Sequence, residues 1–291
     1  MKKLLFGLFL TLMAGGLMSW HWEKTQYGPI NKTDLIECLN METLQAYQLE
    51  ASTPAFAAMH LAPVTINPAD LLGKMTSFEA ADGKQANAYF IPSKKKSKKW
   101  LIVIQEWWGL NDNIKMEADQ YFKDLGDVNV MAVDMYDGKV AATPDSAMKL
   151  MRGADMNRMV ALIQGAVKHA GPKASIYSVG WCFGGMWSLQ TAIIAGPQAK
   201  GSVMYYGRPE SNMEKLKSIQ CDIIGFFGNL DQSPSPAMVN TFEANMKLAG
   251  KNLTAYKYEA GHGFANPSNP SYNAAAKEDS YAKAIAFLKS H

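Results

Sequence analysis

Cys182 stands in a segment whose spacing is typical of a nucleophile. The segment reads G-W-C-F-G-G over residues 180–185, and it joins an apolar run to a helical pattern. Glycines at these positions allow a tight strand-to-helix turn that presents the central residue at the N-terminus of the helix. The helix dipole and the free N–H groups there favour a thiolate and a developing oxyanion. The alternative is a buried structural cysteine in a glycine-rich turn.

Two further residues could complete a triad with Cys182. Asp231 ends the segment G-N-L-D after one apolar run, and His262 lies within G-H-G-F after another. The order nucleophile, acid, base along the chain is the one used by hydrolases that carry such a turn. Taken singly, Asp231 could cap the next helix and His262 could be a surface histidine. Together, the three positions predict nucleophilic catalysis by a thiol with an Asp-held histidine as the base.

A fourth segment, Q-E-W-W-G-L-N over residues 105–111, follows another apolar run. In this arrangement the oxyanion hole is formed by backbone N–H groups of this loop and of the residue after the nucleophile. We therefore expect the main chain of Trp107 and Phe183 to hold the oxyanion. Glu106 is expected beside the turn that carries Cys182, where a carboxylate opposes ionisation of the thiol.

The elements that must position these residues are strands and helices in alternation. Strands are predicted over 74–81, 84–91, 100–105, 128–133, 175–180, 201–206, 222–228 and 253–258. Helices are predicted over 114–125, 144–169 with a possible break at Gly153, 184–195, 234–248 and 274–289. Apolar strands that alternate with helices indicate an α/β fold with a mostly parallel sheet. Asp82-Gly83 indicates an antiparallel hairpin at its start.

From about Met75 to the C-terminus, these segments together resemble the dienelactone hydrolase family. The resemblance also includes D-M-Y at 134–136 and Y-Y-G at 205–207. It implies the three-layer α/β-hydrolase sandwich, and a hydrolase that cleaves a carboxylic ester or lactone (carboxymethylenebutenolidase-like). It further implies that Cys182 attacks the carbonyl, that Asp231 and His262 serve as acid and base, and that Glu106 hydrogen-bonds the resting thiol.

The chain departs from the family at the positions that bind a carboxylate substrate. The family places an arginine four positions after the catalytic histidine, where this chain has Asn266, and its other pocket positions read Pro144, Met148 and Met151. An amide replaces a bidentate guanidinium poorly. Arg208 is a candidate substitute, although a surface position is the alternative. The substrate-binding residues therefore stay unknown, and a catalytically silent binding protein of the same fold and a redox protein are the rival hypotheses.

Composition and the N-terminal sequence indicate the class of partner and the localisation. The formal net charge is +3, which indicates no nucleic-acid partner. Lys2, Lys3 and the apolar run after them predict a signal peptide over 1–19 and export to the periplasm or medium, with an uncleaved anchor as the alternative.

Residues 20–73 are expected to form an extension, helical over 34–48 and then a linker or a strap over 51–68; the hydrolase domain follows over 74–291. A Cys38–Cys221 bridge is left open. We expect a small-molecule ester or lactone as the partner, no metal or other cofactor, and no stable membrane association once the signal is cleaved. The oligomeric state is undetermined.

Overall fold

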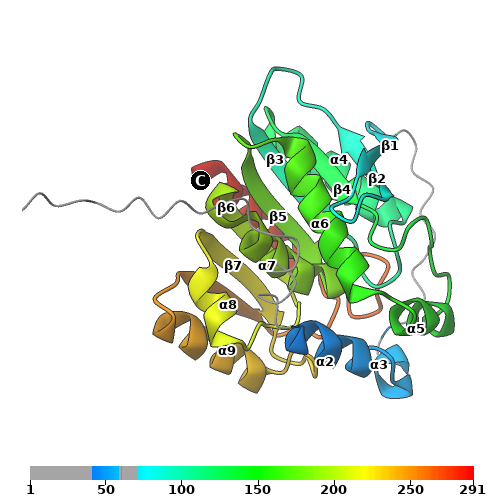
Figure 1. Ribbon diagram of the computed structural model, residues 1–291. Helices are drawn as coiled ribbons and strands as arrows, with labels where there is room; N and C mark the ends of the chain where they lie inside the picture. The colour runs from blue at the N-terminus through cyan, green and yellow to red at the C-terminus, as the bar shows by residue number, and fades with distance from the viewer. Residues whose placement is uncertain (1–40, 59, 61–70) are drawn as a thin grey trace, which may run out of the picture. The chain divides into compact units, whose positions relative to one another are not determined.

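The apolar runs of the sequence form one eight-stranded sheet (Figure 1). The computed structural model describes residues 41–58, 60 and 71–291, and Leu39–His291 form one compact unit. The strands are β1 (Lys74–Glu79), β2 (Gln85–Ile91), β3 (Lys99–Ile104), β4 (Asn129–Val133), β5 (Ser175–Trp181), β6 (Ala199–Tyr205), β7 (Asp222–Gly228) and β8 (Leu253–Tyr258). The central strands are buried along most of their length, which explains their unbroken apolar sequences.

The sheet is mostly parallel and begins with the predicted hairpin. The strand order is β1-β2-β4-β3-β5-β6-β7-β8; β2 is antiparallel to both β1 and β4, and all other pairs are parallel. Gly83 in the hairpin turn has φ of 80°, a value that glycine adopts easily. Because β3, β5, β6, β7 and β8 run in one direction, the segments that follow them meet at one edge of the sheet.

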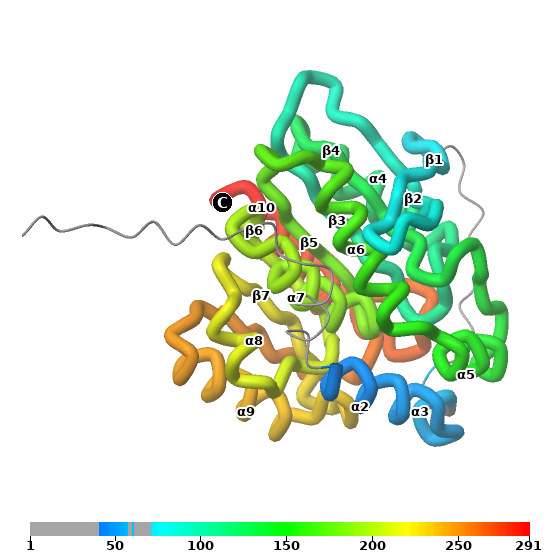
Figure 2. The backbone as a smooth tube through the Cα atoms, viewed as in Figure 1, coloured from blue at the N-terminus to red at the C-terminus, as the bar shows by residue number. Residues whose placement is uncertain are grey.

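Helices cover both faces of the sheet, so the predicted three-layer sandwich is confirmed. The helices are α2 (Glu42–Glu50), α3 (Pro54–Ala58), α4 (Asp112–Leu125), α5 (Pro144–Arg152), α6 (Met156–Ala170), α7 (Phe183–Ala195), α8 (Met213–Ser218), α9 (Pro236–Leu248) and α10 (Ala274–Ser290). α4 and α10 pack together on one face, whereas α6, α7, α8 and α9 lie on the other. The tube in Figure 2 shows α2 and α3, in blue, beside α5.

The long helical stretch predicted over 144–169 is two helices, α5 and α6. α5 ends at Arg152 with Gly153 as its C-cap, and the side chain of Asp155 accepts a hydrogen bond from Asn157 N and so caps α6. The expected break at Gly153 is therefore confirmed. α8, which no part of the sequence analysis anticipated, begins after Asn212, whose side chain accepts hydrogen bonds from two backbone N–H groups of its first turn.

The described part of the N-terminal region packs against the sheet domain. Tyr47 of α2 and Phe56 of α3 are 3% and 2% exposed, and both belong to the main hydrophobic core. The predicted signal peptide, Cys38, residue 59 and all of 61–70 lie outside the described residues, as does the part of the predicted 34–48 helix before residue 41. A boundary at residue 74 stays a prediction. Among the described residues, none of the helices is long and apolar enough to span a membrane.

Candidate active site

Cys182 occupies the sharp turn between β5 and α7. It has φ of 55°, a value uncommon for residues other than glycine, and it is 2% exposed. A Cβ on Gly180 would lie 2.1 Å from the carbonyl oxygen of Gly184, and a Cβ on Gly184 would lie 2.3 Å from that of Ile104. The strand, the helix and β3 are thus too close for any larger residue. This packing gives a physical reason for the G-x-C-x-G-G spacing and holds the sulfur at the N-terminus of α7.

Asp231 and His262 form the pair that the sequence predicts. They follow β7 and β8, and His262 Nδ1 lies 2.8 Å from Asp231 Oδ2. Both side chains are buried, at 9% exposure for His262 and 1% for Asp231. Because the carboxylate accepts the Nδ1 proton, Nε2 of His262 carries the lone pair, and it has no hydrogen-bond partner among the described residues.

The imidazole of His262 lies close to the thiol of Cys182. A ring nitrogen of His262 and Cys182 Sγ lie within 4.8 Å of each other. Burial alone would lower the pKa of His262, but the negative charges of Cys182 and Asp231 outweigh it and raise this pKa well above its usual value. The site therefore favours a histidine that accepts a proton when the thiol loses one.

Glu106 lies after β3, near the turn as expected, but it is bound to another partner. Its Oε2 accepts a hydrogen bond of 2.8 Å from Asn266 Nδ2. Burial raises the pKa of Glu106 to about 7, although His262 and the bond from Asn266 act in the opposite direction. Among the described residues, no hydrogen bond joins Glu106 to the Cys182 thiol, so the expected pairing is corrected. The amide of Asn266 takes up the carboxylate instead.

Two residues of the N-terminal region, rather than Glu106, contact the thiol of Cys182. Tyr47 Oη lies 3.5 Å from Cys182 Sγ, and His60 Nε2 lies 3.6 Å from it. The sequence analysis missed both, because neither stands in a glycine frame or at a strand end. The one available signal was that His60 is one of only five histidines in the chain.

His60 is held firmly in a neutral form. Its Nδ1 lies 2.7 Å from the carbonyl oxygen of Phe56, which can only accept, so Nδ1 carries the proton. Its ring stacks on Phe56 at 4.1 Å between centroids and lies 4.7 Å from Trp107 and 4.8 Å from His262. Burial, followed by the charge of His262, lowers the pKa of His60 to about 3. Nε2 therefore presents a lone pair to the sulfur.

The predicted oxyanion donors, Trp107 and Phe183, come from the loop after β3 and from the start of α7. Trp107 directly follows Glu106 in the loop after β3, and Phe183 is the first residue of α7. Main-chain N–H groups in the first turn of a helix have no partner within that helix. The assignment of these two N–H groups to an oxyanion hole stays a prediction.

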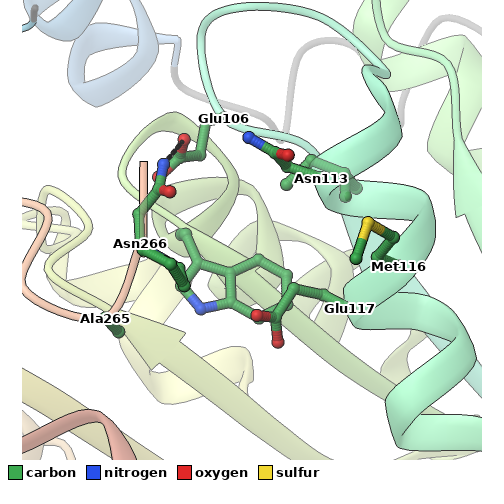
Figure 3. Close-up of a pocket in the computed structure, with 9 residues that line it drawn as sticks. Glu106, Asn113, Met116, Glu117, Ala265 and Asn266 are labelled. Carbon is green, nitrogen blue, oxygen red and sulfur yellow. Dashed lines mark hydrogen bonds between the residues drawn. The ribbon is translucent and has the colours of Figure 1, made fainter. Parts of the chain in front are cut away.

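A small cavity lies beside Glu106. Its volume is about 80 Å³, and Cys182 is not among the residues that line it. Figure 3 shows its polar wall, with the hydrogen bond between Glu106 and Asn266 on one side and α4 residues on the other. The labelled lining residues are Glu106, Asn113, Met116, Glu117, Ala265 and Asn266. The cavity adjoins the site through Glu106 and can hold a few waters or a small group.

Known proteins share both the sequence pattern and the fold. A model of the dienelactone hydrolase family matches residues 86–291. The "Protein usf" of Aquifex pyrophilus is 28% identical over 234 residues, which cover 76% of this chain and 99% of that protein. The "Putative carboxymethylenebutenolidase" of Escherichia coli O157:H7 is 26% identical over 216 residues, which cover 66% and 76%.

The fold is also found in a solved structure. The crystal structure of a dienelactone hydrolase-like promiscuous phosphotriesterase from metagenomic libraries has a TM-score of 0.63 and 23% identity. The match covers 75% of this chain and 98% of that one, and it shows likeness of fold.

Proposed function

This chain belongs to the dienelactone hydrolase family, and from that premise we propose that it cleaves a carboxylic ester or lactone with Cys182 as its nucleophile. The observation that carries the proposal is the hydrogen bond of 2.8 Å between His262 and Asp231, with a free ring nitrogen near the sulfur. That arrangement supplies a nucleophile, a base and a group that orients the base.

The reaction follows from these groups. His262 takes the thiol proton as Cys182 Sγ attacks the carbonyl carbon, and the resulting oxyanion accepts hydrogen bonds from the main-chain N–H groups of Trp107 and Phe183. The imidazolium then donates its proton to the leaving alcohol, and a thioester remains on Cys182. A water that His262 activates hydrolyses the thioester and restores the thiol.

Tyr47 and His60 set the resting state of the thiol. Since His60 Nε2 has a lone pair, the S–H of Cys182 can donate to it, and the hydroxyl of Tyr47 can donate to the sulfur. While the cysteine keeps its proton, its sulfur is held by two hydrogen bonds. Its proton must turn from His60 toward His262 before attack, so we place His60 in the role that the resemblance gave to Glu106.

The substrate that fits best lacks a carboxylate. Asn266 stands where the family has an arginine, and it is engaged with Glu106. Arg208, the candidate substitute, forms a salt bridge with Glu50 of α2. Asn266 has no guanidinium, and the guanidinium of Arg208 is already paired with Glu50. Neither position therefore offers a free guanidinium to a substrate carboxylate. A neutral ester or lactone is therefore proposed in place of a carboxylate-bearing dienelactone.

The test is turnover by the purified chain of small neutral esters, neutral lactones and a carboxylate-bearing dienelactone. Cys182→Ala should abolish turnover, and Cys221→Ala, which removes a half-buried cysteine elsewhere, should keep it. We expect neutral substrates to be hydrolysed with a higher kcat/KM than the dienelactone. Equal rates for wild type and Cys182→Ala on every substrate would contradict the proposal and favour a silent binding protein.

A further inference from the structure

Three lone-pair atoms converge at the base of this site. His60, Cys182 and His262 each present one such atom, and all three lie within 4.8 Å of one another. They come from three separate parts of the chain: the N-terminal region, the β5–α7 turn and the loop after β8. The Cys182 side chain is 2% and the His60 side chain 4% exposed, so bulk water does not supply their hydrogen bonds.

Both histidines are fixed with Nε2 toward the sulfur. His60 Nδ1 donates to the carbonyl of Phe56 at 2.7 Å, and His262 Nδ1 donates to Asp231 at 2.8 Å. Such outer partners, a carbonyl and a carboxylate, are those that orient histidine ligands in metal sites. If either histidine moved its proton from Nδ1 to Nε2, the lone pair on Nδ1 would face an oxygen that can only accept. Both tautomers are therefore fixed.

A single shared proton cannot satisfy this cluster. Whether that proton lies on Cys182 Sγ or on His262 Nε2, at least one of the two Nε2 lone pairs is left without a donor. The bond to His60 at 3.6 Å uses that proton, and Nε2 of His262 is left buried with no partner among the described residues. An unsatisfied buried acceptor is unfavourable, so the cluster is suited to a ligand that all three lone pairs can bind.

We propose that Cys182, His60 and His262 form a binding site for a soft divalent cation of the Zn²⁺ type. One thiolate and two imidazoles are ligands that zinc prefers, and three protein ligands leave a fourth tetrahedral position for water. With Zn–S of about 2.3 Å and Zn–N of about 2.0–2.1 Å, the S···N edge of a tetrahedron is about 3.5–3.6 Å. The observed separation of Sγ and His60 Nε2 is 3.6 Å.

Binding displaces one proton. The S–H bond of Cys182 breaks, its proton leaves to solvent, and sulfur and two nitrogens donate electron pairs to the cation. The cation's two positive charges then balance the thiolate and the carboxylate of Asp231. The sulfur is no longer free to attack a carbonyl, so the bound metal inhibits hydrolysis; this consequence, unlike the binding itself, rests on the proposed function.

Co²⁺ is the probe, because its thiolate complexes absorb in the near ultraviolet and its tetrahedral complexes absorb strongly in the visible. The untagged full chain is titrated with Co²⁺ under reducing conditions, and Zn²⁺ is then added as a competitor. We expect one Co²⁺ per chain with both absorptions, and their loss on addition of Zn²⁺. Cys182→Ala should lack the thiolate absorption, and His291→Gln, which removes a histidine near the C-terminus, should match wild type.

His60 gives the decisive variants. His60→Gln should bind Co²⁺ at least about tenfold more weakly, whereas His60→Cys, which restores a ligand, should bind it with a stronger thiolate absorption. A wild-type spectrum without thiolate absorption would overturn the proposal, as would wild-type affinity in His60→Gln. Ester turnover is measured on the same preparations before Co²⁺ is added. Ester turnover without Co²⁺ binding would overturn the metal site and leave the proposed hydrolase intact. Co²⁺ binding without ester turnover would overturn the proposed hydrolase and leave the metal site intact.

Discussion

Tyr47 and His60, the two side chains within hydrogen-bond distance of the Cys182 sulfur, come from one short stretch of chain. Tyr47 donates from a buried hydroxyl whose pKa is raised well above its usual value by burial and by the charge of Cys182. It therefore stays protonated and can stabilise a thiolate. His60 presents a lone pair and stabilises the thiol. The two residues act on the ionisation of the nucleophile in opposite directions.

Removal of the Tyr47 hydroxyl should make the thiolate harder to form. A hydrogen bond to a charged group contributes about 1.5–3 kcal/mol, so in Tyr47→Phe the pH profile of Cys182 alkylation should move up by about one to two pH units. The rate of iodoacetamide labelling between pH 6 and pH 10 measures it, with peptide mapping to assign the site. Tyr256→Phe on β8 is the matched control. A profile that stays in place or moves to lower pH would contradict this role.

At this scale the sequence reveals the hydrogen-bonded pair of Asp231 and His262 and misses its surroundings. Asp231 and His262 could be predicted because each follows a strand whose direction brings its end to Cys182. His60 could not, because its position depends on a packing fit that no motif encodes: its ring stacks on Phe56, lies 4.7 Å from that of Trp107 and donates to the carbonyl of Phe56. The wrong pairing of Glu106 has the same origin, since the amide that binds it comes from 160 residues away.

The elements α2 and α3 (Glu42–Ala58), which we call the strap, lie across the thiol end of the sheet domain. Gln48 Nε2 donates to the carbonyls of Met151 and Ala154, at 2.9 Å each, at the C-terminal end of α5. Thr43 donates to Glu210 at 2.5 Å. These bonds hold the strap at the end of α5 and near α8, and they keep Tyr47 over Cys182.

Loosening the strap should expose the thiol. Gln48→Ala removes the hydrogen bonds to α5. The free energy that holds the strap over the thiol should fall by about 1–1.5 kcal/mol, so alkylation of Cys182 should be roughly five- to tenfold faster at fixed pH. Gln120→Ala, which removes an exposed amide on α4 bound to Asp124, serves as the control. If both variants are labelled at the wild-type rate, the strap does not limit access to the sulfur.

Most elements of the sheet domain, although not α8, were predictable because their own sequences determine them. Buried strands such as β3 and β5 read as unbroken apolar runs, and caps such as Asp155 mark helix starts. α2 has no comparable signal: no side chain caps its start, and its buried residues, Thr43, Leu44 and Tyr47, do not stand out from their neighbours. Its place depends on contacts with α5 and with the loop before α8, which no local pattern encodes.

For the molecule as a whole, burial of Glu106 links the site to stability. Burial raises its pKa to about 7 from an ordinary 4.5, so in this pH window the folded protein holds a proton that the unfolded chain has lost. Stability should therefore fall as the pH rises from about 4.5 to about 7 and then level off. This loss amounts to about 3 kcal/mol in the free energy of unfolding.

Glu106→Gln should remove that dependence. The amide oxygen of glutamine can still accept from Asn266, and glutamine cannot ionise. The variant should match wild type near pH 4.5 and be more stable by up to about 3 kcal/mol at pH 8. Urea unfolding at both pH values measures the difference, with exposed Glu214→Gln as the control. A constant difference between wild type and Glu106→Gln at the two pH values would contradict the buried acid.

The most direct test of the account is to find the covalent intermediate on Cys182. Wild-type chain is mixed with p-nitrophenyl acetate, quenched in acid within the first turnover, digested and mapped by mass spectrometry. We predict one acetyl group, held as a thioester on the peptide that contains Cys182, and its absence after prior alkylation of the thiol. Turnover of the ester with no acetyl group on Cys182, or with the acetyl group on another residue, would contradict the account.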